Sequence, residues 1–143
     1  MKLTRTELKK LAETKLKEVK ALYENELYDG AYYASGYVLE FALKARICKI
    51  LNIDAFPEQR KISKLFKTHN LKDLIFLAGL EKEFNNAKAN NSNLLTNWSI
   101  ISDWSEHLRY ELVGSSQKES IEGIIEALED PKDGVFTWIK KKW

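Results

Sequence analysis

The segment from about Asp29 to Leu51 constrains the fold more than any other part of the chain. If this segment is helical, apolar or small side chains occupy almost every side of the helix. A helix that is apolar nearly all round belongs in the middle of a bundle or at a subunit interface. Its polar exceptions include Glu40 and Lys44, which stand in the favourable i,i+4 order. We therefore expect a core helix here.

An amphipathic helix is expected before this core helix. Thr4 and Glu7 have the spacing of a capping box, in which the threonine hydroxyl accepts a hydrogen bond from the glutamate amide. Apolar residues then recur at helical spacing as far as about Glu26. The Asp29-Gly30 pair marks a break or a tight entry into the next element. The first half of the chain thus predicts two long helices.

The second half predicts shorter helices joined by turns. A short helix is expected to begin near Asn70, and the asparagine-rich segment 84–93 is expected to be a loop. A fourth helix is predicted over 94–112, with Trp104 on its inner face, and a fifth over 117–128. Asp130-Pro131 then predicts a cap followed by proline at the first position of a terminal helix. No segment alternates with period two, so we expect an all-α fold: an antiparallel bundle of four to five helices with a short C-terminal helix.

Length and composition are those of one globular domain, residues 1–143. The chain has 143 residues, with only two prolines and six glycines, a composition that favours long helices. Cys48 is the only cysteine, which excludes an internal disulfide and a multi-cysteine metal site. We expect neither a metal nor a cofactor. No apolar run approaches the roughly 20 residues of a membrane span, and no apolar signal core follows Met1, so we expect a cytoplasmic protein.

Positive charge is concentrated in one stretch, although the net charge of the chain is only +2. The C-terminal segment 92–143 has six basic and nine acidic residues, so it is an unlikely place for a phosphate. A basic stretch follows the core helix and contains Arg60, Lys61, Lys64, Lys67 and His69. Such a stretch is more often a solvated face than a nucleic-acid site. We predict that any anionic ligand is held here, together with Lys44 and Arg46 of the core helix.

Three short motifs carry a resemblance to a known family. Residues 31–45 follow the pattern small-x-Tyr-x-small-Gly-Tyr-x-x-Glu and end in Leu-Lys-Ala. Residues 67–71 read Lys-Thr-His-Asn-Leu, close to a Thr-His-Asp-Leu element, with Asn70 in place of the usual acid. Residues 104–110 resemble a Trp…Arg-Tyr element. In this order, the three motifs resemble those of the HEPN family of helical nucleotide- and RNA-associated domains, and the resemblance covers most of the chain.

The HEPN resemblance implies a helical homodimer. It also implies a role as a partner of a minimal nucleotidyltransferase, in a toxin–antitoxin or defence-type system, or as a binder of nucleotide or RNA. Some branches are metal-independent ribonucleases with an arginine four to six residues before a histidine. That motif is absent, because Arg60 lies too far before His69 and Arg109 follows His107. An enzyme is therefore disfavoured, and no catalytic residue is assigned beyond the weak candidates His69, His107 and Arg109.

The candidate binding residues each have a structural alternative. Glu40 and Lys44 form either an intrahelical ion pair at the edge of the bundle or a polar pocket facing a ligand or a partner. His69 either helps to cap the helix that follows it or contacts a phosphate or a base. His107 with its neighbours forms either a polar network against Glu40 or a site. The full set of candidate ligand-binding residues is Glu40, Lys44, Arg46, Arg60, Lys64, Lys67, His69, Arg109 and Tyr110.

Three functions stay open from the sequence. The first is a non-catalytic HEPN-type module that binds nucleotide, RNA or a nucleotidyltransferase. The second is a metal-independent ribonuclease with a rearranged site that uses His69 or His107 with Arg109. The third is a helical interaction protein without a ligand.

Overall fold

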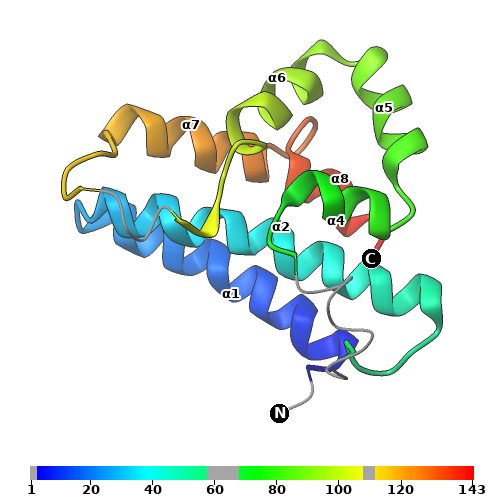
Figure 1. The fold of residues 1–143 in the computed structure, drawn as a ribbon. Coiled ribbons are helices and arrows are strands. Elements are labelled where there is room, and N and C mark those ends of the chain that lie inside the picture. Colours follow the sequence, from blue (N-terminus) through cyan, green and yellow to red (C-terminus); the bar gives the residue numbers. More distant parts are fainter. Residues whose placement is uncertain (1–2, 58–67, 108–111) are drawn as a thin grey trace.

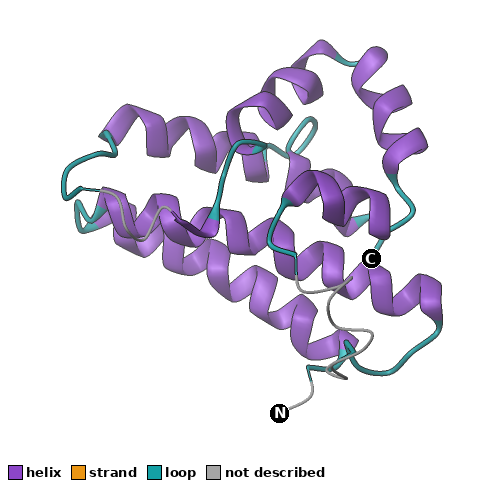
Figure 2. Ribbon diagram, viewed as in Figure 1, coloured by secondary structure: helices purple, strands orange, loops and turns teal. Residues whose placement is uncertain are grey.

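The fold is all-α, as the sequence predicts. The computed structural model describes residues 3–57, 68–107 and 112–143, and within these ranges it contains helices and no strand (Figures 1 and 2). No helix in the described ranges is long and apolar enough to cross a membrane. The described ranges contain the two long helices expected in the first half and more short helices in the second half than expected. The helices are α1 (Arg5–Glu24), α2 (Tyr28–Leu51), α4 (Leu71–Leu77), α5 (Glu81–Ala89), α6 (Ser92–Ile101), α7 (Lys118–Glu129) and α8 (Val135–Lys140).

Helix α1 begins at the predicted capping box. The Thr4 hydroxyl accepts a hydrogen bond from the amide of Glu7 at 3.2 Å, and a Glu7 carboxylate oxygen accepts from the amide of Thr4 at 2.7 Å. Both amides would otherwise lack a partner within the helix. The chain before α1 also pairs with the segment after α2, because the amide of Phe56 donates to the carbonyl of Leu3 at 2.8 Å.

Helix α2 is the central element of the bundle, as predicted. It packs against α1 on one side and against α4, α7 and α8 on others (Figure 1). Half-exposed apolar side chains on α2 are confined to its C-terminal end, at Ile50 and Leu51. The other helices of the same chain therefore cover most of the apolar surface of α2.

The asparagine-rich segment is not a loop, so that prediction is wrong. Helices α5 and α6 occupy most of it, and only Asn90 and Asn91 join them. The Asn91 side-chain oxygen accepts hydrogen bonds from the amides of Asn93 and Leu94, 3.1 Å each, and so caps α6. Asparagine favours helix ends as well as turns. Phe84, 1% exposed, anchors α5 in the core.

The helix predicted over 94–112 is also wrong, because α6 ends at Ile101. The chain turns after Ile101 and returns Trp104 to the core, where only 4% of the side chain is exposed. The indole N–H donates to the carbonyl of Tyr33 at 3.1 Å. A straight helix would leave this contact with α2 unmade. The turn therefore goes with a tertiary contact, and the spacing of apolar residues along the sequence does not predict it.

The C-terminal helix begins later than predicted. Pro131 lies in a turn rather than at the first position of a helix, and α8 starts at Val135. Asp130 caps this turn, since its carboxylate accepts hydrogen bonds from the amides of Lys132 and Asp133 at 2.9 and 2.7 Å. The expected short C-terminal helix is present, and Val135 and Ile139 are buried as an amphipathic helix requires.

Candidate functional site

A buried carboxylate on α2 is the centre of the candidate site. Glu40 is 2% exposed, and Lys44, one turn later, donates from Nζ to Glu40 Oε1 at 2.7 Å. An unpaired carboxylate in such a position is strongly unfavourable, so the charge of Glu40 depends on its partners. The intrahelical pair predicted from the sequence is present, but Glu40 is buried in the bundle rather than placed at its edge.

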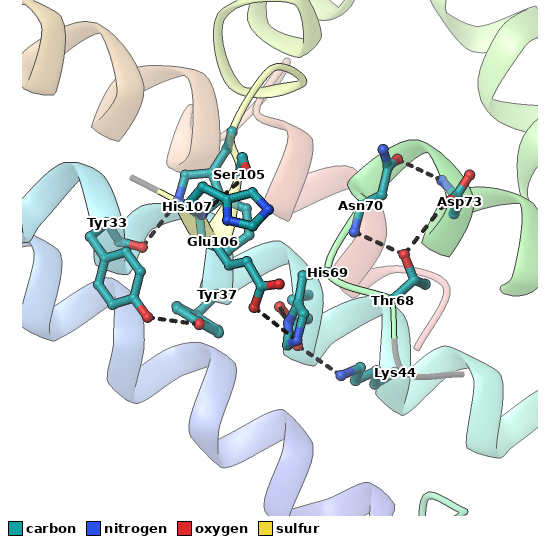
Figure 3. A network of polar contacts seen from close by, with 12 residues as sticks. Tyr33, Tyr37, Lys44, Thr68, His69, Asn70, Asp73, Ser105, Glu106 and His107 are labelled. Carbon is teal, nitrogen blue, oxygen red and sulfur yellow. Dashed lines mark hydrogen bonds and ion pairs between the residues drawn. The ribbon is translucent and has the colours of Figure 1, made fainter. Parts of the chain in front are cut away.

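His69 is the second partner of Glu40, and it joins two carboxylates. Its Nδ1 lies 2.9 Å from Glu40 Oε2 and 3.0 Å from Oε1, and its Nε2 lies 3.1 Å from Glu106 Oε2 (Figure 3). Ionised carboxylates only accept hydrogen bonds, so both contacts are satisfied when each ring nitrogen carries a proton. His69 thus links α2 to the segment after α6 through its two ring nitrogens.

The start of α4 is capped by the neighbours of His69, so the imidazole can contact the two carboxylates. Asn70 is the cap of α4, and its side-chain oxygen accepts from the amide of Asp73 at 3.1 Å. Thr68 accepts from the amide of Asn70 at 3.0 Å (Figure 3). These two residues fix the start of α4, as the sequence suggests, without the imidazole of His69. The imidazole instead reaches across to α2.

Aromatic rings of α2 and Trp104 border the charged cluster. The Tyr37 ring packs edge-on against Trp104, with centroids 5.1 Å apart, and against His69 at 6.4 Å. Its hydroxyl lies 3.0 Å from that of Tyr33. Burial raises the pKa of Tyr37, and the hydrogen bond with Tyr33 and the nearby carboxylates of Glu40 and Glu106 raise it further. The tyrosine is thus a neutral neighbour of the cluster.

Gly36 allows Trp104 to approach α2. A Cβ added at Gly36 would lie 1.8 Å from Cδ2 of the indole and 2.0 Å from Cε2. No side chain fits in that space. The glycine of the α2 pattern therefore has a packing role, because it lets the indole ring lie directly on the helix backbone.

A polar cavity opens beside His69. Its volume is about 330 Å³, close to the lower end of the range typical of small-molecule sites. Hydroxyl, amide, imidazole and carboxylate groups dominate its walls, and the buried Trp104 contributes only a small apolar part. The lining residues are Thr68, His69, Asn70, Trp104, Ser105, Glu106 and His107. The cavity offers donors and acceptors to the edge of a planar polar ligand.

The structure brings together some of the predicted site residues and separates another. Glu40, Lys44 and His69 form one cluster, and His107 lines the adjoining cavity. Arg46 faces elsewhere, where its guanidinium donates to the carbonyl of Lys142 at 3.0 Å. The remaining predicted residues lie outside the described ranges: Arg60, Lys64, Lys67, Arg109 and Tyr110.

Sequence reasoning missed Glu106 and the contribution of Tyr37. Glu106 lies 37 positions after His69 in an irregular segment, and nothing local to either residue indicates their contact. Tyr37 did carry a signal, since it stands three residues before Glu40 and therefore on the same side of α2.

Comparison with known protein families decides what kind of domain this is. A sequence model of the HEPN domain matches residues 6–130. The chain belongs to the HEPN family. Searches of curated protein sequences and of solved structures gave no significant match. The HEPN resemblance rested on three separate motifs, and the structure places residues of all three around one point: Glu40 from the first, His69 from the second, and Trp104 with Glu106 from the third.

Proposed function

We propose that this HEPN domain is a non-catalytic module that binds a nucleotide, free or within single-stranded RNA, in the cavity beside His69. The observation that supports this most is the composition of the cavity wall. Thr68, Asn70, Ser105 and His107 supply hydrogen-bonding groups, and the exposed imidazole of His107 also offers a ring face. Single-stranded RNA is recognised by this combination, in which base edges are hydrogen-bonded and base faces stack on aromatic rings.

The contacts of His69 argue against catalysis by this residue. Cleavage of RNA through its 2′-hydroxyl requires a group that takes or gives a proton within hydrogen-bond reach of the substrate. Both ring nitrogens of His69 already face carboxylate oxygens. The histidine therefore serves to hold Glu40 and Glu106 in place. This supports a binding role over an acid–base role.

The ribonuclease alternative is supported by one observation. His107 lines the same cavity and is exposed, so its imidazole is accessible to a substrate. A catalytic site there would also need a cation for the phosphate, and the sequence candidate is Arg109, outside the described residues. Incubation of the purified protein with single-stranded RNA, without metal, separates the two functions. Intact RNA supports the binding module, whereas cleavage that disappears in His107→Ala supports the ribonuclease.

Two of the cations that the sequence offers for a phosphate, Lys44 and Arg46, have other partners in the structure. Lys44 is engaged with Glu40, and Arg46 with backbone carbonyls. Neither side chain lines the cavity. The role of Arg60, Lys64 and Lys67 stays a prediction from the sequence.

Titration calorimetry with nucleoside monophosphates and a short single-stranded RNA tests the binding proposal. Ser105→Phe fills the cavity and should weaken binding about tenfold or more, because it displaces the base from its polar partners. Ser99→Phe is the matched control, since Ser99 is exposed on α6 and lies outside the cavity. The proposal is wrong if the wild type binds none of the probes at millimolar concentration, or if both variants bind as the wild type does.

The single domain, the homodimer and the nucleotidyltransferase partner remain proposals drawn from the sequence. The physical reason for the dimer is weaker than the sequence suggests, because the same chain covers most of α2. Light scattering at micromolar concentration gives the mass directly. A dimer mass supports self-association, and a monomer mass across the concentration range excludes it.

A further inference from the structure

A partly buried carboxylate in the cavity beside His69 has one oxygen without a partner. Glu106 is the only acid among the described residues that line this cavity, and its side chain is 32% exposed. Its Oε2 atom lies 3.1 Å from His69 Nε2 (Figure 3). Within the described ranges, no hydrogen bond or ion pair reaches its Oε1 atom. A carboxylate has about four acceptor sites on its two oxygens, so Glu106 can accept further hydrogen bonds from a ligand.

The contact with His69 holds this carboxylate in position. The imidazole is itself held by Glu40, whose two oxygens lie 2.9 and 3.0 Å from Nδ1 of the ring. Glu40 is 2% exposed and also contacts Lys44. A chain of contacts thus runs from the buried part of α2 through His69 to Glu106. An acceptor that is already in place loses little freedom when a ligand binds, which favours a ligand with matching donors.

Other side chains of the cavity wall supply hydrogen-bond donors. The Asn70 side-chain oxygen accepts from the amide of Asp73, so its NH₂ group remains available to a ligand. The Ser105 oxygen accepts from the amide of His107 at 3.2 Å, which leaves the hydroxyl hydrogen free to donate. In the described part of the chain, neither of these two donors has an acceptor. The cavity therefore combines one carboxylate with neutral donors.

We propose that the cavity is selective for guanine, and that Glu106 is the residue that determines this specificity. The inference rests on the proposed nucleotide-binding function and names the base that is bound. The Watson–Crick edge of guanine presents two adjacent donors, the ring N1–H and the 2-amino group, beside the O6 acceptor. The Glu106 carboxylate accepts from both donors, and Asn70 or Ser105 donates to O6.

The other bases match the Glu106 carboxylate less well. Adenine and cytosine each have an amino group next to a ring nitrogen that only accepts, and uracil has a single ring N–H between two carbonyl oxygens. In each case a lone pair of the base would face a lone pair of the carboxylate. A site that hydrogen-bonds two donors of a ligand rejects an analogue that lacks one of them, because a polar group is then left unpaired.

An arginine side chain of a partner protein is the competing occupant of the cavity. A guanidinium group also presents paired N–H donors to a carboxylate. It has no acceptor, however, so it would leave the donors of Asn70 and Ser105 without partners. Guanine satisfies both the carboxylate and the donors. The composition of the cavity wall therefore favours the base over the arginine side chain.

Titration calorimetry with GMP, inosine monophosphate and AMP tests the specificity. The wild type should bind GMP about tenfold more tightly than AMP, and inosine monophosphate, which lacks only the 2-amino group, should fall between them. In Glu106→Gln the preference for GMP over AMP should disappear, because an amide has one acceptor and one donor group where the carboxylate has two acceptors. Asp103→Asn is the matched control and should keep the preference, since Asp103 is exposed and does not line the cavity.

The ratio of the two affinities separates a role in specificity from a role in folding, because a loss of structure would weaken GMP and AMP alike. Equal binding of GMP and AMP by the wild type would overturn the inference and leave the proposed function intact. A preference for GMP that persists in Glu106→Gln would overturn the role of Glu106. No binding of any nucleotide at millimolar concentration would overturn the inference and the proposed function together.

Methylguanidine serves as the probe for the competing occupant. The wild type should bind it more weakly than GMP, because it offers no acceptor to the donors of the cavity wall. Methylguanidine binding that is tighter than GMP binding, and that is lost in Glu106→Gln, would overturn the inference in favour of an arginine side chain of a partner protein.

Discussion

Two carboxylates with little exposure, Glu40 and Asp133, are stabilised in different ways. Glu40 contacts the ammonium of Lys44 and a ring nitrogen of His69. Asp133, 9% exposed, accepts hydrogen bonds from the neutral side-chain amides of Asn91 at 2.7 Å and Asn93 at 3.2 Å. Both acids are satisfied, but only the first belongs to a network of charges.

The difference separates a candidate site from a structural contact. The Glu40 network adjoins a polar cavity, so a ligand in that cavity would contact His69 or Glu106 directly. Asp133 instead fastens the junction of α5 and α6 to the turn before α8, and its carbonyl also accepts from Asn97 at 2.8 Å. The loss of one charged partner leaves a buried charge uncompensated, whereas the loss of one neutral hydrogen bond leaves no charge without a partner.

The largest effect is expected for His69→Ala. The substitution leaves the buried Glu40 with Lys44 alone, and it should lower the free energy of unfolding by about 2 kcal/mol. This figure lies below the usual range for breaking a buried pair, because Lys44 stays and the cavity admits water. Urea unfolding measures the change. The double variant Glu40→Gln/His69→Ala should recover part of the loss, and a double variant that is less stable still would contradict this account.

A smaller loss is expected at the second carboxylate. Asp133→Ala removes the acceptor of two asparagine amides and should destabilise the protein less than His69→Ala does, since no charge is left without a partner. Asp133→Asn should be milder again, because the new side-chain oxygen still accepts from Asn91 while Asn93 can turn its own oxygen towards the new amide. Urea unfolding of the three variants gives the order. If Asp133→Asn is as harmful as His69→Ala, the distinction between the two carboxylates fails.

The smallest effect is the pH dependence at Asp133. Hydrogen bonds from Asn91 and Asn93 hold the pKa of its carboxyl below the usual range. The folded state therefore favours the ionised form, and this contribution to stability is present above the pKa of the unfolded chain. It is lost as the pH falls through about 4 towards the folded value. The stability gap between the wild type and Asp133→Asn should narrow from pH 6 to pH 3, and a constant gap would exclude this linkage.

The parts of the fold that depend on neighbours in sequence were predictable. The capping box of Thr4 and Glu7 and the i,i+4 pair of Glu40 and Lys44 appear in the structure as the sequence indicates. The nearly all-apolar surface of α2 correctly predicts its central position. Each of these features is decided within a few turns of one helix, where residue spacing alone fixes which side chains meet.

The parts that depend on distant contacts were not predictable. The turn after Ile101 exists because Trp104 packs on α2, and helical spacing continues past that point in the sequence. The same holds for His69, because neither a helix cap nor a ligand contact, the two roles that the sequence suggests, indicates its contact with Glu106, 37 positions away. Asn91 caps α6, but the sequence predicts a loop there because asparagine favours turns and helix caps alike. Local pattern does not distinguish these outcomes.

The contact between Gly36 and Trp104 has a consequence for the divergence of this sequence. Since a methyl group at position 36 would occupy the space of the indole ring, the two positions cannot change independently. We expect chains that keep the large aromatic ring at 104 to keep glycine at 36, and chains with alanine at 36 to carry a smaller residue at 104. Relatives that keep both residues should pack the segment after α6 against α2 as this chain does. The same relatives should then have a cavity lined by that segment.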